Sequence, residues 1–164
     1  MSAETIQLYE YVNHPYEQVS AALVRDAVGL FQRATTTATG RADSLVTKLN
    51  VKIGGFEVGR NVVVHVLKTN PEAKPPGHIA EKATEFEIEW HAEKAAALFP
   101  AMRATLTVYP LSPNETQLQL RGEYDPPGGI FGTVADRLVG HRIAEASVHS
   151  FLDALARRMN EELS

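Results

Sequence analysis

The C-terminal part of the chain carries a helical pattern of apolar residues. Between Phe131 and Met159 these residues recur at steps of three and four, so they share one face of a helix: Ala144, Val148, Phe151, Leu152, Leu155 and Met159. Two prolines and two glycines at 126–129 interrupt whatever element precedes them. The pattern predicts a helix roughly 44 Å long, at about 1.5 Å per residue, whose apolar stripe the rest of the chain must cover.

The N-terminal pattern predicts a strand followed by a helix. Residues 5–12 alternate between apolar and polar types, as in a half-buried strand, and Glu10 interrupts the inner face. Pro15 suits the first position of a helix, which we expect Gly29 to end. The threonine-rich residues 34–43 are expected to form a loop.

Alternation of apolar and polar residues returns several times in the middle of the chain. The predicted strands are 44–53, 62–67, 85–90, 102–108 and 118–124. Short connections between successive strands favour an antiparallel sheet. The sequence therefore predicts an α+β fold. It comprises a curved antiparallel sheet of six or seven strands, one or two short helices after the first strand, and the long C-terminal helix.

Composition limits the possible classes of protein. A chain of 164 residues, 44% hydrophobic and 22% charged, predicts a single domain over residues 1–164. The net charge of −4 does not indicate a basic surface of the kind that binds nucleic-acid phosphates. The absence of cysteine excludes disulfides, thiol catalysis and cysteine zinc sites. No apolar run approaches ~18 residues, so we expect no membrane span. The first residues show no secretory signal, so we expect a cytoplasmic protein.

Motifs for metals and cofactors are weak or incomplete. His141, Glu145 and His149 follow one another at steps of four, but the row turns about 80° around the helix and no second cluster completes a ligand set. The stretch 91–93 matches the histidine and glutamate of zinc deaminases without their cysteines. The sequence has no nucleophile elbow, phosphate loop or dinucleotide motif. We therefore expect no metal and no cofactor, and we interpret the row as two surface Glu–His pairs on the flank of the helix.

The order of elements and two stretches resemble a known superfamily. One stretch is VNHPYEQV at 12–19, and the other is GEYDPPGG at 122–129, which continues into DRL at 136–138 and AEA at 144–146. The chain resembles the START-like (SRPBCC) superfamily of helix-grip folds, which includes polyketide cyclases and binders of lipids and other hydrophobic ligands. The resemblance implies a sheet wrapped around the long helix with a ligand cavity between them. It does not imply a particular reaction.

Three polar residues are candidates for the inside of such a cavity. Glu10 lies on the inner face of its strand, and a helical step of 100° per residue places Arg137 and His141 within about 20° of Val148. Either residue could meet Glu10 or a polar group of a ligand. A strand bulge would instead turn Glu10 to solvent, and a break at Gly140 would remove Arg137 from this face. A structural salt bridge is a further alternative for Arg137.

Apolar candidates for the cavity wall come from the inner faces of the predicted strands and the long helix. They are Leu8, Val64, Phe86, Trp90, Met102, Leu106, Leu120, Tyr124 and Val148. Each could equally serve as an ordinary core residue. Trp90 and Tyr124 usually need a hydrogen-bond partner when they are buried.

Three functions remain open at this point. The leading hypothesis is a module that binds a small hydrophobic or amphipathic ligand, such as a lipid, an isoprenoid or a polyketide-like molecule. The second is a cyclase or dehydratase that uses an acid–base pair in the cavity, for which Glu10 with His141 or Arg137 is the candidate. The third is a protein-interaction module with a collapsed cavity. A sheet with an open edge is also compatible with a homodimer.

Overall fold

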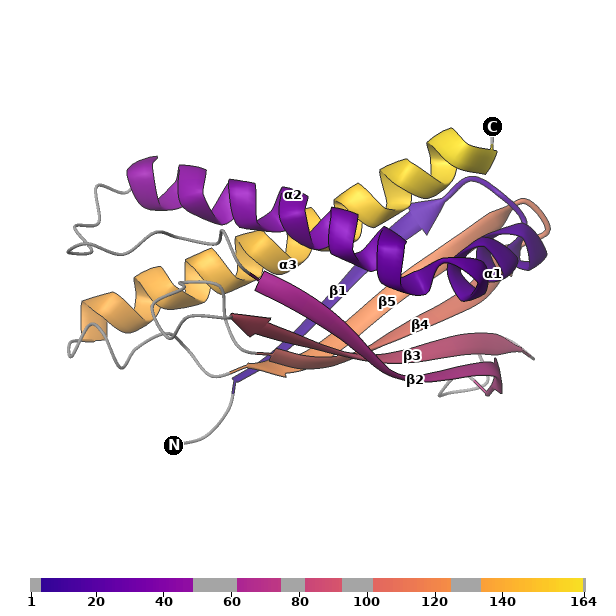
Figure 1. The fold of residues 1–164 in the computed structure, drawn as a ribbon, viewed down its shortest axis with the longest axis horizontal. Coiled ribbons are helices and arrows are strands. Elements are labelled where there is room, and N and C mark those ends of the chain that lie inside the picture. Colours follow the sequence, from indigo (N-terminus) through magenta and orange to yellow (C-terminus); the bar gives the residue numbers. More distant parts are fainter. Residues whose placement is uncertain (1–3, 49–61, 75–81, 93–101, 125–133, 164) are drawn as a thin grey trace.

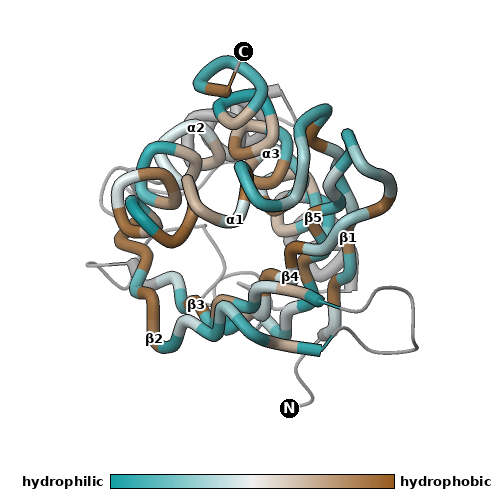
Figure 2. Tube along the Cα trace, turned by 90° about the vertical axis from the view of Figure 1, so that its right-hand side faces the viewer, coloured by the Kyte–Doolittle hydropathy of each residue, from teal (hydrophilic) through white to brown (hydrophobic). Residues whose placement is uncertain are grey.

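The computed structural model describes residues 4–48, 62–74, 82–92, 102–124 and 134–163 (Figure 1). Its elements are β1 (Glu4–Val12), α1 (Tyr16–Arg25), α2 (Ala27–Lys48), β2 (Val62–Ala73), β3 (Ala83–Ala92), β4 (Met102–Ser112), β5 (Glu115–Tyr124) and α3 (Val134–Leu163). The helices lie over one face of a curved sheet, and α2 crosses α3. Figure 2 shows the three helices grouped on one side of the curved sheet.

The sheet is antiparallel throughout, in the order β1-β5-β4-β3-β2. The α+β class and the antiparallel arrangement are confirmed, but the described residues form five strands and not six or seven. The strand predicted at 44–53 is wrong in its first part, because residues 44–48 belong to α2. The rest of that range lies outside the described residues.

The helical region after β1 differs from the prediction. The first helix ends before Asp26, and α2 begins at Ala27 and continues through Gly29 and the expected loop at 34–43. The hydroxyl groups of three threonines donate to carbonyl oxygens four residues earlier, at 2.8, 3.0 and 3.3 Å, so their polar side chains are accommodated on the helix. An apolar row at helical spacing faces the core: Leu30, Phe31, Ala34 and Ala38. Burial of this row outweighs the modest helix propensity of threonine.

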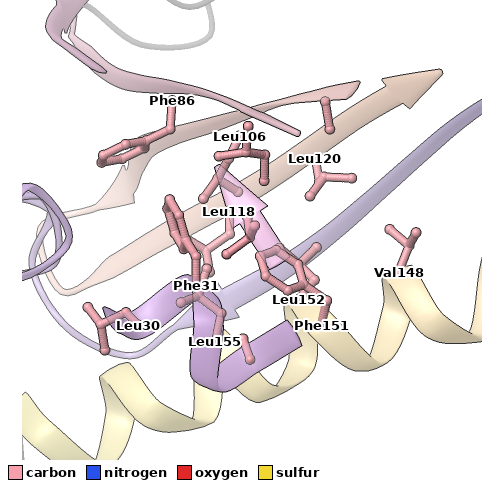
Figure 3. Packing of buried hydrophobic residues seen from close by; sticks show 14 of the residues in the cluster. Leu30, Phe31, Phe86, Leu106, Leu118, Leu120, Val148, Phe151, Leu152 and Leu155 are labelled. Atoms are coloured by element: carbon pink, nitrogen blue, oxygen red, sulfur yellow. The ribbon is translucent and has the colours of Figure 1, made fainter. Parts of the chain in front are cut away.

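The long C-terminal helix is confirmed. It spans 30 residues, and each of the six predicted apolar residues on its stripe is at most 1% exposed. The centre of the core is a group of aromatic rings around Phe151 (Figure 3). Phe151 and Trp90 pack edge to face at a centroid distance of 4.8 Å, and Phe151 lies 6.1 Å from Phe31, which in turn meets Phe86 at 5.3 Å. These rings join α2, α3 and β3.

Two residues of α2 fasten this helix to the sheet through side-chain hydrogen bonds. The indole N–H of Trp90 donates to the hydroxyl of Thr35 at 2.9 Å, so the expectation that buried Trp90 has a polar partner is confirmed. The amide of Gln32 binds the backbone of the edge strand β2, donating to the carbonyl of Val62 at 3.1 Å and accepting from the N–H of Val64 at 3.2 Å. Side chains of α2 thus provide hydrogen-bond partners for the buried indole of β3 and for backbone groups of the edge strand β2.

The outer face of the sheet carries three tyrosines near one end. Tyr9 and Tyr11 on β1 are exposed, and Tyr109 on β4 is buried with its hydroxyl 3.4 Å from the side-chain oxygen of Gln119. Burial raises the pKa of Tyr109 above its ordinary value of 10.0, and the neighbouring Tyr9 and Tyr11 raise it further.

The substitution Phe151→Ala should lower the free energy of unfolding by about 3–5 kcal/mol, because it leaves a cavity where α2, α3 and β3 meet. Val28→Ala is the control, since Val28 is 62% exposed on α2 and its truncation should cost little. Urea unfolding followed by circular dichroism gives both values. Equal effects of the two substitutions would contradict the assigned core.

The raised pKa of Tyr109 predicts how stability depends on alkaline pH. The folded state holds the Tyr109 proton more tightly than the unfolded state, so this group's contribution is complete below about pH 10 and is lost as pH rises through the folded pKa. The free energy of unfolding should therefore fall above about pH 10, and fall less in Tyr109→Phe. Denaturant titrations at several alkaline pH values test this, with Tyr9→Phe as the control for an exposed phenol.

Candidate functional site

A row of mostly apolar side chains crosses the inner face of the sheet and ends in a phenolic group. Strand register places Val64, Trp90, Met102 and Tyr124 in one row across four neighbouring strands. The row ends in the hydroxyl group of Tyr124, which is only 1% exposed. The apolar wall candidates other than Leu8 are likewise buried in the core cluster. These side chains therefore pack the interior as core residues.

Met102 is the adaptable part of this row. A Cβ atom added to Gly122 would lie 2.9 Å from the sulfur of Met102, so the thioether occupies the space that the glycine leaves on the inner face. Methionine side chains are flexible and tolerate rearrangement. Met102 is only 2% exposed, so its side chain closes the interior beside Tyr124.

Tyr124 is hydrogen-bonded to His141 of α3. The bond joins the phenolic oxygen to Nδ1 of the histidine, and the two rings lie 6.0 Å apart with 31° between their planes. The other ring nitrogen, Nε2, lies 3.7 Å from a carboxylate oxygen of Glu145. Glu145 is exposed, whereas His141 is partly buried. A chain of three polar side chains thus connects the interior with the protein surface.

A groove runs beside this chain, between the edge strand β1 and α3. It has a volume of about 660 Å³ and is lined by Leu8, Arg142, Glu145, Ala146, His149, Ser150 and Asp153. This volume is within the range of about 300–1,000 Å³ that is typical of ligand sites. Glu145 belongs both to the groove and to the polar chain that ends at Tyr124.

The charged groups of the groove differ in their partners. Asp153 is bound by Arg157 at 3.0 Å, and Glu145 faces His141. Within the part of the chain that the structure describes, Arg142 has no ion-pair partner. The groove therefore offers apolar contacts at Leu8 and Ala146 together with a cationic group that can bind an anion.

Comparison with known proteins finds similarity at the level of structure. No protein-family model matches the sequence, and no curated protein sequence does. The Zhui aromatase/cyclase of Streptomyces sp. R1128 superposes with a TM-score of 0.53 at 15% identity, over 99% of this chain and 96% of that chain. A protein of Thermus thermophilus superposes with a TM-score of 0.51 at 17% identity, over 98% and 100% of the two chains.

The chain has the START-like fold. A START superfamily protein of Mycobacterium smegmatis is also similar, with a TM-score of 0.44 at 12% identity over 98% of this chain and 99% of that chain. At these identities the two matches with TM-scores of 0.53 and 0.51 show a shared fold and no particular ligand.

The expected pairing of Glu10 with His141 is not formed in this START-like structure. Glu10 is half-buried on the inner face, opposite Leu118, whereas His141 binds Tyr124, six positions farther along β5 (118 to 124). At about 3.3 Å per residue these levels are about 20 Å apart along the strand. Arg137 lies in α3, but its side chain is outside the described residues.

Two contributors to the packing of α2 against β3 were not predicted from the sequence. The apolar spacing of α2 could have identified Phe31, and the need of buried Trp90 for an acceptor could have suggested Thr35. The pairing of Glu145 with His141 was predicted from their spacing of four residues on one helix face, and the structure places their side chains 3.7 Å apart.

Two expected absences concern metals and membranes. No group of three potential metal-ligating side chains occurs among the described residues. Within the same described ranges, no helix is long and apolar enough to cross a membrane.

The Tyr124–His141 contact predicts the protonation pattern of the histidine ring. A carboxylate beside Nε2 favours the form with its hydrogen on Nε2, so Nδ1 should accept the phenolic hydrogen. Nitrogen-15 NMR of the neutral imidazole should show this tautomer, and the Nδ1 shift should change in Tyr124→Phe. Tyr109→Phe is the control, because its hydroxyl lies on the opposite face of the sheet. Identical spectra for the wild type and Tyr124→Phe would contradict the contact.

Proposed function

We propose that this chain binds a small hydrophobic or amphipathic ligand, such as a lipid, an isoprenoid or a polyketide-like molecule, between its sheet and its C-terminal helix. The observation that carries the proposal is the groove of about 660 Å³ between β1 and α3. A START-like fold supports the same function, because its long helix and curved sheet can hold a ligand between them.

The chemistry of the groove favours an amphipathic anion over a purely apolar molecule. Leu8 and Ala146 offer apolar surface to the body of the ligand. Arg142 can pair with a carboxylate, sulfonate or phosphate group, and the hydroxyl of Ser150 can add a hydrogen bond. Such a site follows the usual design of ligand pockets, in which a few polar groups orient an otherwise apolar molecule.

An enzyme of the cyclase or dehydratase type is a second candidate. The observation in its favour is the buried Tyr124 hydroxyl hydrogen-bonded to His141, because acid–base catalysis requires such groups in contact. A role in protein interaction alone is less well supported. The aromatic group around Phe151 fills the middle of the interior, as a collapsed cavity requires, but the groove leaves room for a ligand at the edge.

Titration with the fluorescent amphipathic anion 1-anilinonaphthalene-8-sulfonate tests the groove directly. Ala146→Trp fills the groove with an indole ring and should weaken binding by about tenfold or more, which corresponds to about 1.4 kcal/mol. Glu161→Trp is the matched control, because Glu161 is exposed on α3 outside the groove. Arg142→Gln should weaken binding of this dye while leaving its uncharged analogue 1-anilinonaphthalene unaffected.

Equal affinities in the wild type, Ala146→Trp and Glu161→Trp would contradict the proposed site. Native mass spectrometry of freshly purified protein, followed by solvent extraction, then identifies any natural ligand that accompanies the wild type. The same ligand should be depleted from Ala146→Trp. Retention at the wild-type level would also contradict a ligand site in the groove.

A further inference from the structure

We propose that two copies of this chain associate edge to edge through β1, in a symmetric dimer that brings their two grooves together. The proposal goes beyond the ligand-binding function and does not depend on it. Three observations carry it: the open edge of β1, the charges on the groove face of α3, and the register between this strand and this helix.

The strand β1 forms one edge of the sheet, and its outer side has open backbone groups. At the opposite edge, the amide of Gln32 binds the carbonyl of Val62 and the N–H of Val64 on β2. Among the described residues, no side chain binds the backbone of residues 4–12 on β1 in this way. Open N–H and C=O groups at a sheet edge can pair with a strand of another chain. Pairing of β1 with a second β1 uses both open edges, so the assembly closes at two copies.

The sequence of β1 suits antiparallel pairing with its own copy. With the two-fold axis at Leu8, Tyr9 of each copy lies opposite Gln7 of the other on the outer face of the sheet. Tyr9 is 47% exposed in the single chain, so it has surface to bury in this contact. Glu10 lies opposite Ile6 in this register, and no like charges are paired. An axis at Glu10 would instead set two carboxylates directly opposite each other, which is unfavourable.

The helix α3 lies beside β1 and runs in the same direction (Figure 1). The N–H of Asn13, directly after the strand, accepts no other role than donation to the side-chain oxygen of Asn160 at 2.9 Å, which fixes the register of helix and strand. Five strand residues of about 3.3 Å cover the same length as about eleven helical residues of 1.5 Å, so Leu8 lies level with about position 149 of α3. Leu8 also lines the groove whose helical residues lie between positions 142 and 153. A two-fold axis at Leu8 therefore passes near the middle of this helical segment.

The groove face of α3 is complementary in charge to a copy of itself. Rotation about this axis makes the two helices antiparallel. Arg142 of each copy then lies level with Asp153 of the other, and Glu145 lies level with His149. The arginine and the aspartate are thus placed opposite each other twice, while like charges of the two copies lie at different levels.

The dimer covers the open side of each groove with the helix of the other copy. Ala146 and Ser150 lie at the middle of this helix face, and their small side chains allow the two helices to approach closely. The guanidinium of Arg142 has five N–H donors, so its pairing with Asp153 leaves donors for an anionic ligand. Two open grooves of about 660 Å³ thereby become one chamber that both copies line.

Sedimentation equilibrium of the full chain between about 1 μM and 1 mM measures the association. The wild type should reach twice the chain mass of 18.0 kDa. Arg142→Asp places an acidic group opposite Asp153 in both symmetric contacts and should raise the dissociation constant by about tenfold or more. Arg25→Asp is the control, because Arg25 is exposed on α1, and it should leave the dissociation constant unchanged.

A charge exchange separates the contact between copies from effects within one chain. Arg142→Asp combined with Asp153→Arg restores opposite charges across the axis and should return the dissociation constant to within about threefold of the wild-type value. The two positions lie eleven residues apart on one helix, about 16 Å, so they do not touch within a copy. A combined variant that associates no better than Arg142→Asp alone would overturn the assigned helix contact.

Hydrogen exchange tests the pairing of the two strands. In concentrated wild-type protein, the β1 amides that face away from β5 should exchange about tenfold or more slowly than in dilute protein. The N–H of Val64 is the control, because Gln32 already binds it at every concentration. A monomer throughout the concentration range would overturn the proposal, and so would a dimer whose β1 exchange does not depend on concentration. Binding of 1-anilinonaphthalene-8-sulfonate by such a monomer would leave the ligand-binding function intact.

Discussion

Burial of the apolar stripe of α3 is the constraint on which the rest of the structure depends. The stripe is too long and too apolar to remain in water, and its residues are almost fully covered. The curved sheet covers one side, and α2 covers another through the contacts of Phe31 with Phe151. Because aromatic rings lock α2, α3 and β3 together, the positions of the remaining strands follow from this one packing arrangement.

The candidate site lies beyond the part of α3 that the aromatic group packs against. Beyond the aromatic group, α3 turns its flank toward the edge strand β1, and the groove opens between them. His141 lies next to the buried stripe, so its ring can reach inward to Tyr124 while Glu145, one turn later, remains in the groove. A single helix therefore supplies the core, the polar contact with the interior and the groove wall, which ties the shape of the groove to the packing of the protein.

Local periodicity allowed much of this architecture to be predicted, and its limits explain the errors. The stripe of α3 and the inner faces of the strands follow directly from alternation and helical spacing. The prediction of a loop at 34–43 gave too much weight to the threonine content. Burial of Phe31 and its neighbours in the core makes that segment helical instead. Tyr124 and His141 were each candidates, but their contact depends on how α3 is placed along β5. The same placement separates His141 from Glu10, and no local pattern encodes it.

The amide of Gln32 has a consequence that concerns other protein molecules. An unpaired strand edge is a template on which a strand of another chain can add, and such addition leads to aggregation. On β2 the outward carbonyl of Val62 and N–H of Val64 are already engaged by Gln32, which occupies the place that a neighbouring strand would take. A side chain of the helix layer thus blocks this stretch of the edge against intermolecular pairing and helps to keep the folded protein from assembling into extended sheets.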